Sequence, residues 1–366
     1  MKILFLYTGG TIGMRQTSSG LAPAHGIEEW LSKNITGSSV SYTVEYYSRI
    51  IDSANINAKD WYGIAAICRT RAQNYDAIIV LHGTDTMAYT SSALSFLLAD
   101  IDIPVILTGA QLPWSAPQSD ALSNVRGALA CATSQTDNYA GVSLFFNGHL
   151  HFGVRATKRY SESFTGFISP NSVLRAQINT HGEASPIAPT TTVHTNTTSP
   201  YISALSAASD VTGRSVSFED AQHLPDIVPI TITPAMNMRR LHEQLLPHNS
   251  KVDAPDAVIL LAYGAGNGPD TDPDFCRILA GYCDKGGTLV VSSQSPVGGV
   301  HLGTYAAGNS LARLGALSGY DATFEALYTK LYVLHVAGFT GTDIRHAMNQ
   351  SLVGEFSPQE PAATAL

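Results

Sequence analysis

Apolar and polar positions alternate in blocks along residues 76–113. Two continuous apolar runs of strand length, AIIVL at 77–81 and IPVIL at 103–107, are each followed by a polar segment that contains glycine. Between them, residues 87–99 place apolar side chains at 87, 94, 97 and 98, a spacing that predicts a helix. Strand, helix and strand at this distance indicate a βαβ unit. Wholly apolar strands are typical of a parallel sheet that is buried on both faces.

Similar blocks occur on both sides of this unit. In the first half of the chain, further strands are predicted at 2–7 and 141–146, and a helix at 121–132. After residue 225 the pattern predicts three strands, at 228–232, 257–262 and 288–292. It also predicts two helices, at 275–282 and 322–335. We therefore predict an α/β protein with two domains. The larger N-terminal domain has a mostly parallel, doubly wound sheet, and the smaller C-terminal α/β domain has a parallel sheet.

A change in composition suggests where the two domains separate. A chain of 366 residues exceeds what one core usually holds. Residues 185–201 (SPIAPTTTVHTNTTSPY) are rich in Thr, Ser and Pro, which is typical of a linker or an exposed loop. We predict an N-terminal catalytic domain at 1–190, a linker at 191–225 and a C-terminal domain at 226–366.

Charge and hydrophobic run length exclude several classes of partner. The net charge is −8 and the chain has no Lys/Arg run, which argues against binding to nucleic acid or to anionic membranes. No apolar run is long enough to span a bilayer. The apolar stretch near the N-terminus has five residues and ends in glycines, so it does not resemble a secretory signal. We expect a cytoplasmic protein.

The residues that commonly hold metals or cofactors do not form a recognisable pattern. The four cysteines are far apart and form no CxxC motif, so we interpret them as buried apolar side chains. His149 and His151 are two residues apart and are weak candidates for metal ligands. The chain has no GxGxxG, P-loop or GxSxG motif. We expect neither a metal nor a cofactor.

Three of the predicted strands end in similar polar segments: YTGGT at 7–11, HGTDT at 82–86 and LTGAQ at 107–111. In open parallel sheets, ligands bind beyond the carboxyl ends of the strands. Glycine lets the backbone approach a ligand closely, so these segments predict a site for a small polar molecule. Simpler interpretations stay open, since two glycines can form a plain turn and Thr84 or Asp85 can cap the following helix.

Threonines at strand ends can perform nucleophilic chemistry when a base removes the hydroxyl proton. A lysine can be that base, and an aspartate beside it can orient it. Asp85 adjoins Thr84, and Lys158 in VRATKRY is the candidate lysine. The alternative for Lys158 is a hydrated charge on a loop.

Two of these segments together, TGGTIGM at 8–14 and HGTDTM at 82–87, resemble the bacterial L-asparaginase family. The resemblance continues in the expected order and runs from residue 2 to about 355, through ATK at 156–158, YGAGNGP at 263–269 and the stretch 298–309. The residues of these motifs are similar to those of the cytosolic, type I branch of the family.

The resemblance implies a set of roles. Thr11 is the nucleophile that forms an acyl-enzyme and releases ammonia, while Thr84, Asp85 and Lys158 form the second catalytic group. Asp85 also binds the α-ammonium group and Ser53 the α-carboxylate of the substrate. Further substrate contacts are implied for Asp52, Gly83, Ala110 and Tyr305, and for Asn267 lent by a neighbouring subunit. The family places its sites between subunits of a homodimer or homotetramer, and uses no metal or cofactor.

Two positions depart from the family pattern. Leu21 stands where many relatives have a tyrosine in a lid, although RQTSSG at 15–20 suits a mobile lid. Some type I enzymes have an allosteric asparagine site that includes a cysteine. Ser295 stands near that position, whereas Thr157 matches another residue of the site.

The expected function is hydrolysis of L-asparagine to L-aspartate and ammonia. A broader glutaminase-asparaginase stays open, because one methylene changes binding by only about 1–3 kcal/mol. An inactive asparagine-binding sensor is a further alternative, but it would not need Thr11, Thr84 and Lys158. An amidotransferase subunit would carry an additional N-terminal domain.

Overall fold

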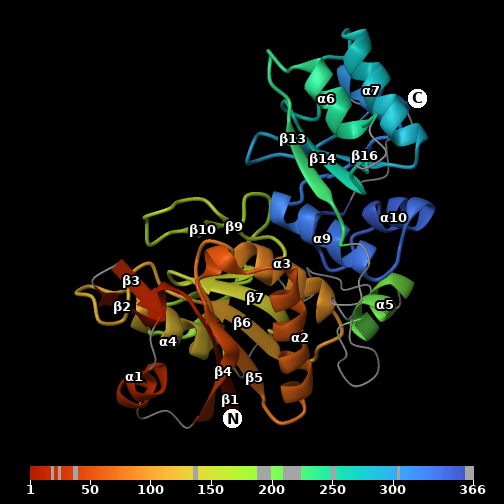
Figure 1. The fold of residues 1–366 in the computed structure, drawn as a ribbon. Coiled ribbons are helices and arrows are strands. Elements are labelled where there is room, and N and C mark those ends of the chain that lie inside the picture. Colours follow the sequence, from red (N-terminus) through yellow and green to blue (C-terminus); the bar gives the residue numbers. More distant parts are fainter. Residues whose placement is uncertain are drawn as a thin grey trace. The chain divides into compact units, whose positions relative to one another are not determined.

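The computed structural model describes residues 1–17, 20–23, 26–35, 40–134, 139–187, 199–208, 224–248, 253–302 and 306–358. The chain divides into two compact units, Met1–Ser215 and Val216–Leu366 (Figure 1). Each unit has its own sheet and its own apolar core.

The first unit contains an eight-stranded sheet in the order β12-β11-β8-β7-β6-β5-β1-β4. Five neighbouring strands are parallel: β4 (Ser41–Ile51), β1 (Lys2–Gly9), β5 (Ala77–Leu81), β6 (Pro104–Thr108) and β7 (Gly141–Phe146). Three short antiparallel strands complete one edge: β8 (His149–Phe152), β11 (Ala176–Ile178) and β12 (Ala184–Pro186). Strands β1 and β5 are almost entirely buried, as their apolar sequences predict.

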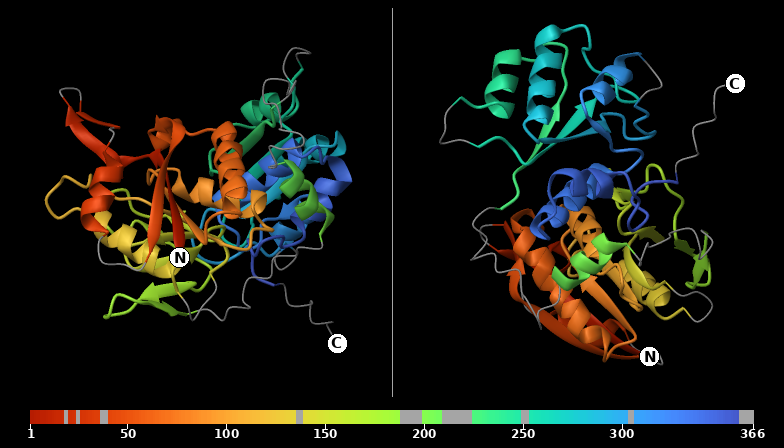
Figure 2. Two further views of the ribbon diagram at one scale, coloured as in Figure 1. Left: turned by 90° about the horizontal axis from the view of Figure 1, so that it is seen from below. Right: turned by 90° about the vertical axis from the view of Figure 1, so that its right-hand side faces the viewer.

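Helices cover both faces of this sheet (Figure 2). On one face, α1 (Ile27–Asn34) and α4 (Ala121–Ala132) pack into the same apolar core. On the other face, α2 (Ala58–Ala72) packs against α3 (Met87–Leu97), which also contacts α5 (Pro200–Ala208). The unit also has short elements near its strand ends: η1 (Thr11–Gly13), β2 (Met14–Thr17), β3 (Gly20–Pro23), η2 (Ser53–Asn55), β9 (Thr157–Lys158) and β10 (Phe167–Ile168).

The strand order creates a switch point between β1 and β5. The chain first runs from β1 to β4 on one side, and α2 then carries it back to β5 on the other side of β1. The connections that leave β1 and β5 therefore run to opposite sides of β1 beyond the carboxyl ends of these strands. Ligands of doubly wound sheets bind at such a point.

The second unit has a four-stranded parallel sheet in the order β13-β14-β15-β16. Its strands are β13 (Ile227–Thr231), β14 (Ala257–Ala262), β15 (Thr288–Ser293) and β16 (Leu317–Ser318). Its helices are α6 (Met238–Leu245), α7 (Pro273–Asp284), α8 (Ala306–Arg313), α9 (Phe324–Val336) and α10 (Gly341–Met348). Side chains from β14, β15 and α7 form most of the core.

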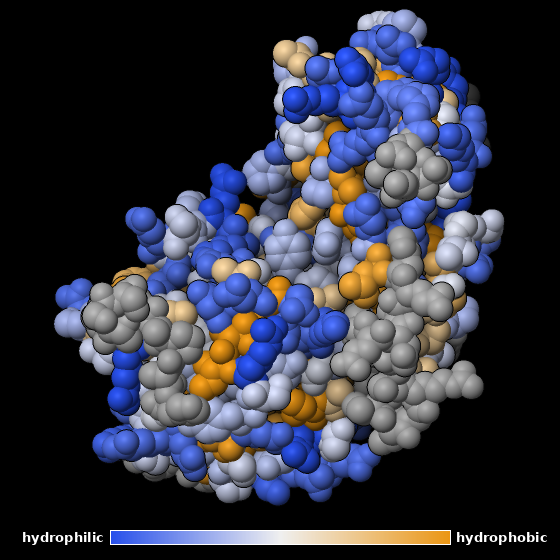
Figure 3. All heavy atoms as spheres, in the orientation of Figure 1, coloured by the Kyte–Doolittle hydropathy of each residue, from blue (hydrophilic) through white to orange (hydrophobic). Residues whose placement is uncertain are grey.

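Most described side chains on the face drawn in Figure 3 are hydrophilic. In the described part of the chain, the large apolar side chains that are exposed come from separate segments rather than from one element: Met1, Tyr160, Phe164, Val173, Ile187, Leu224 and Val297. Among the described residues, no helix is both long enough and apolar enough to cross a bilayer.

The predicted fold class is confirmed, with differences at the ends of elements. Strand 103–107 begins one residue later, at Pro104, because proline cannot donate a ladder hydrogen bond and is tolerated at the first position of a strand. The antiparallel edge and the β2–β3 hairpin were not predicted. The hairpin contains most of the expected lid segment, of which residues 18–19 lie outside the described part.

The predicted domain limits, 1–190, 191–225 and 226–366, stay a prediction. Helix α5 falls within the predicted linker, and residues 191–198 and 209–223 of that linker lie outside the described residues.

Candidate active site

Two glycines bring the connections after β1 and β5 into contact. A Cβ atom on Gly10 would lie 2.3 Å from the backbone nitrogen of Gly83. A Cβ atom on Gly83 would lie 2.4 Å from the hydroxyl oxygen of Ser53. Gly10 also has a positive φ of 86° and donates a hydrogen bond to the carbonyl of Ile51 at 3.2 Å. Only glycine allows three chain segments to meet this closely.

Thr11 begins the short helix η1 directly after this contact, and its side chain is partly exposed. The turn is closed by a hydrogen bond from the Gly13 amide to the Gly10 carbonyl at 3.2 Å. The Trp114 amide also donates to the Ile12 carbonyl at 3.1 Å. Since Thr11 follows Gly10 and Thr84 follows Gly83, the two threonines flank the glycine contact.

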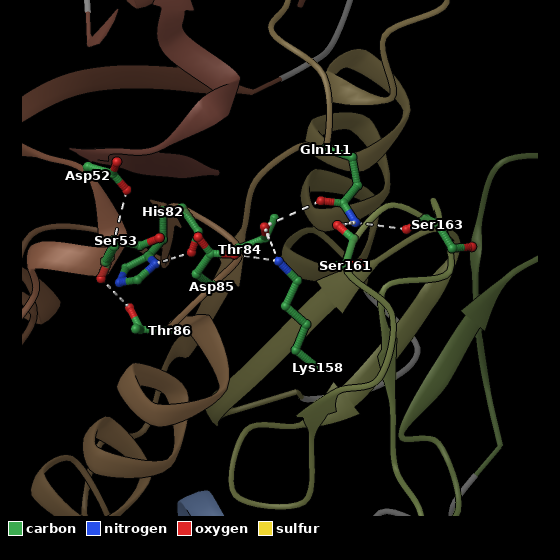
Figure 4. Close-up of polar contacts among 12 residues, drawn as sticks. Asp52, Ser53, His82, Thr84, Asp85, Thr86, Gln111, Lys158, Ser161 and Ser163 are labelled. Carbon is green, nitrogen blue, oxygen red and sulfur yellow. Dashed lines mark hydrogen bonds and ion pairs between the residues drawn. The ribbon is translucent and has the colours of Figure 1, made fainter. Parts of the chain in front are cut away.

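Lys158 joins Thr84 and Asp85 from a distant part of the chain (Figure 4). Its Nζ atom donates to Oγ1 of Thr84 at 2.8 Å and to Oδ1 of Asp85 at 2.6 Å. The Lys158 side chain is 16% exposed, whereas that of Asp85 is 64% exposed. The cluster therefore combines a shielded amine, a buried hydroxyl and a carboxylate that still reaches solvent.

The segment DSAN at 52–55, directly after β4, is the third chain segment at this contact. Asp52 caps η2 by accepting a hydrogen bond from the Ala54 amide at 3.2 Å. Thr86 donates its hydroxyl proton to the Ser53 carbonyl at 2.8 Å. Ser53 itself is buried against Gly83. The structure thus brings Asp52, Ser53 and Gly83 together at one end of the sheet.

The connection after β6 supplies a residue that the sequence analysis did not assign. Ala110 is buried in this connection. Its neighbour Gln111 accepts a hydrogen bond from the Thr84 hydroxyl at 3.3 Å (Figure 4). The LTGAQ motif drew attention to this segment, but nothing in the sequence indicated what the glutamine contacts.

Other residues named from the sequence lie elsewhere. Asn267 belongs to the second unit, where its amide donates to the Tyr263 carbonyl at 2.8 Å. Tyr305 lies outside the described residues. Leu21 is in β3, Thr157 is in β9 and Ser295 is exposed in the second unit.

His82, the first residue of the HGTDT segment, is fully buried. Its Nδ1 atom is 2.6 Å from the Gly83 carbonyl, which can only accept, so Nδ1 carries the proton. Its Nε2 atom then accepts a hydrogen bond from the Thr90 hydroxyl at 3.0 Å. Burial lowers the pKa of His82 to about 4, so the ring is neutral near pH 7.

This burial predicts a pH-dependent stability. Between the unfolded pKa of 6.5 and the folded pKa of about 4, the unfolded chain binds more protons at His82 than the folded chain does. The free energy of unfolding should therefore fall as the pH falls through this range, by roughly 3 kcal/mol for this residue. Urea denaturation at pH 7 and pH 4.5 measures the change. His82→Gln should reduce it, whereas the same substitution at the exposed His181 should not; equal losses in all three proteins would contradict the assignment.

The histidine pair considered for metal binding lies on β8. His151 is buried, its Nδ1 atom is 2.8 Å from the Ser169 hydroxyl, and burial lowers its pKa to about 3. Its ring centroid is 6.3 Å from that of His149. Within the described part of the chain, no group of three or more His, Cys, Asp or Glu side chains is placed to hold a metal ion.

Both halves of the chain match family models of asparaginases. Residues 2–187 match the family model described as "Asparaginase, N-terminal", and residues 238–348 match "Glutaminase/Asparaginase C-terminal domain". L-asparaginase 1 of Escherichia coli (strain K12) is 34% identical over 369 residues, which cover 98% of this chain and 99% of the relative.

Solved structures agree with this result. The thermostable L-asparaginase of Thermococcus kodakarensis has a TM-score of 0.80 at 29% identity, covering 98% of this chain and 100% of that one. L-asparaginase I of Vibrio cholerae has a TM-score of 0.76 at 30% identity, covering 98% and 99%.

Proposed function

The chain belongs to the asparaginase family, and on that premise we propose that it hydrolyses the side-chain amide of L-asparagine to L-aspartate and ammonia. The observation that carries the proposal is the contact of Lys158 with Thr84 and Asp85, one residue from the Gly10–Gly83 contact that Thr11 follows. A protein that only binds an amino acid has no need for a shielded amine on a buried hydroxyl.

Thr11 is the proposed nucleophile. Its oxygen attacks the amide carbon, and a base takes the hydroxyl proton. The base then passes that proton to the departing nitrogen, so that the C–N bond breaks to leave an ester on Thr11 and free ammonia. Backbone N–H groups of the glycine-rich strand ends are suited to stabilise the negative charge that develops on the amide oxygen.

Thr84, Asp85 and Lys158 are the proposed second catalytic group. In the second half of the reaction, water attacks the ester carbon, its proton passes to this group, and the Thr11 oxygen leaves with a proton. Lys158 must lose a proton to act as a base. Asp85, at 2.6 Å, holds the amine beside Thr84 in either protonation state.

The substrate's charged groups have proposed partners at the same strand ends. The exposed carboxylate of Asp85 suits the α-ammonium group, since only one of its oxygens is bonded to Lys158. The Ser53 hydroxyl suits the α-carboxylate. Further contacts are proposed from Asp52, Gly83 and the backbone of Ala110.

Two residues of the second unit are also proposed to contact the substrate or to lie near it. By resemblance, Asn267 contacts the substrate in a neighbouring subunit and Tyr305 lies near the substrate, which requires a homodimer or homotetramer. This assembly stays a prediction, and so does the cytoplasmic location. Size measurement in solution tests the first, because a monomeric active protein would remove Asn267 from the mechanism.

Asp85→Asn should weaken both binding and turnover. The variant loses the negative charge that pairs with the α-ammonium group, and charged hydrogen bonds contribute about 1.5–3 kcal/mol. We expect kcat/KM for L-asparagine to fall by about 10²-fold, and its affinity in a Thr11→Ala background to fall by about tenfold. Titration calorimetry measures the affinity. The exposed Asp284→Asn is the control, and unchanged affinity in Asp85→Asn would show that the α-amino group binds elsewhere.

Ammonia release from L-asparagine and L-glutamine, measured over a wide concentration range, tests the function itself. Release from asparagine alone supports the proposal, and comparable release from both amides indicates a broader amidase. Binding of asparagine without release would contradict the proposed hydrolysis. A sigmoidal curve would indicate a second asparagine site despite Ser295.

A further inference from the structure

We propose that Gln111 is a positioning residue for this reaction: it sets the direction of the Thr84 hydroxyl proton and ties residues 159–166 to the site. The inference rests on the proposed function. It concerns a side chain that joins three elements: the connection after β5, the connection after β6, and the segment between β9 and β10 (Figure 4).

The orientation of the Gln111 amide follows from its partners. Its Nε2 atom lies 2.8 Å from the carbonyl oxygen of Ser163 and 3.3 Å from that of Ser161. Carbonyl oxygens only accept, so the amide nitrogen must face them. A flipped amide would place its oxygen against two other oxygens. The Oε1 atom therefore faces Thr84.

The direction of the Thr84 proton follows in turn. An amide oxygen only accepts, so the Thr84 hydroxyl donates its proton to Oε1 at 3.3 Å. The lone pairs of the same hydroxyl accept a hydrogen bond from Lys158 Nζ at 2.8 Å. Thr84 is only 5% exposed, so water competes little for these bonds. In this arrangement Lys158 donates and does not act as a base.

A change of proton direction is required for catalysis. Lys158 can receive the Thr84 proton only after Nζ has lost one of its own and the hydroxyl has turned from Gln111 towards Nζ. The bond to Gln111 stabilises the resting orientation and opposes this turn. Gln111 thus influences the pH at which the pair becomes competent, without contacting the reacting carbon.

Gln111 is itself held firmly. Its backbone amide lies 3.0 Å from each carboxylate oxygen of Asp120, just before α4. Asn124 supports Asp120 at 3.0 Å and also donates to the Gly109 carbonyl at 3.0 Å. A rigid helix therefore sets the position of the Gln111 side chain.

The segment that Gln111 ties down is otherwise exposed. Its base is closed by bonds from the Arg159 and Tyr160 amides to the Gly166 carbonyl, at 2.7 and 3.2 Å. Tyr160 and Phe164 are 50% and 42% exposed. Asp85 bonds Lys158 directly, the same segment carries the exposed Arg159 and Glu162, and Asp120 lies behind Gln111.

Two substitutions test the acceptor role of the Gln111 amide. Gln111→Met removes the acceptor, so the Thr84 hydroxyl turns to Lys158 without losing a bond. The acidic limb of the kcat–pH profile should then move to lower pH by about one unit. Gln111→Glu keeps an acceptor and adds a negative charge, so the limb should move to higher pH by a similar amount, about one unit. If Gln111 served only in packing, the acidic limb would move in the same direction in the two variants or would not move in either.

Both variants lose the amide donor, and this is tested without relying on activity. Trypsin should cleave after Arg159 about tenfold faster in each variant than in the wild type, since opening of the segment no longer breaks the bonds to Gln111. The exposed Gln73→Met is the control and should change neither the profile nor the cleavage rate.

The possible failures are distinguishable. Absence of amide hydrolysis by the wild type would overturn the proposed function. Normal wild-type hydrolysis with unmoved or parallel pH limbs in the two variants would overturn the role of Gln111 in proton direction. Unchanged cleavage after Arg159 would overturn the tether. Gln111→Glu is nearly isosteric, so it keeps the test decisive if Gln111→Met fails to fold.

Discussion

Replacement of Thr11 by alanine is expected to lower kcat for L-asparagine by at least about 10³-fold, because it removes the proposed nucleophile and with it the acyl-enzyme. Thr11 lies at the partly exposed start of η1, and its turn is held by backbone hydrogen bonds that alanine retains. The variant should therefore fold normally and still bind asparagine. Ammonia release gives kcat, and titration calorimetry gives the affinity.

Two further variants make this result specific. Thr11→Ser keeps a hydroxyl and should retain far more activity than alanine. Thr70→Ala, at an exposed position of α2, should leave kcat unchanged. Near-normal turnover in Thr11→Ala would remove this residue from the mechanism and direct attention to Thr84.

Lys158→Met should reduce kcat by about 10²- to 10⁴-fold, the usual contribution of a general base. Methionine fills a similar volume but can neither accept a proton nor bond Thr84 and Asp85. Asp85 is 64% exposed, so water can hydrate its carboxylate once the lysine is gone. We therefore expect a small change in thermal stability together with a large loss of turnover.

The comparison of turnover and stability distinguishes catalysis from structure. Lys59→Met, at an exposed position of α2, is the matched control and should change neither quantity. A large drop in the melting temperature of Lys158→Met with little loss of kcat would mean that the lysine only connects β9 to the loop after β5.

The HGTDT motif shows how much of the structure the sequence could predict. Apolar runs on both sides indicated a buried strand and a helix, and the structure has both, at Ala77–Leu81 and Met87–Leu97. The sequence predicts such elements because the spacing of apolar positions differs between a buried strand, which is continuously apolar, and a helix, in which apolar residues recur on one face. The residue pair Thr84 and Asp85 could likewise be singled out, since both lie at a strand end. Their roles in catalysis stay predictions.

The antiparallel edge and the β2–β3 hairpin were missed for a physical reason. Strands β8, β11 and β12 have three or four residues each, too few for a periodic pattern to stand out. Pairing between short strands depends on what lies beside them in the sheet, and propensity carries little of that information.

The sequence by itself determined which residue types stand at the strand ends, the two-domain α/β class and the resemblance that suggests a reaction. Only the tertiary structure decided that Gly10 touches Gly83, that Lys158 contacts Thr84, 74 residues away in the sequence, and that Gln111 accepts a hydrogen bond from the Thr84 hydroxyl. The reason is that the strand order places the ends of β1 and β5 side by side at a switch point. Hydrogen-bond direction then depends on donors and acceptors from separate segments, a relation that no local pattern records.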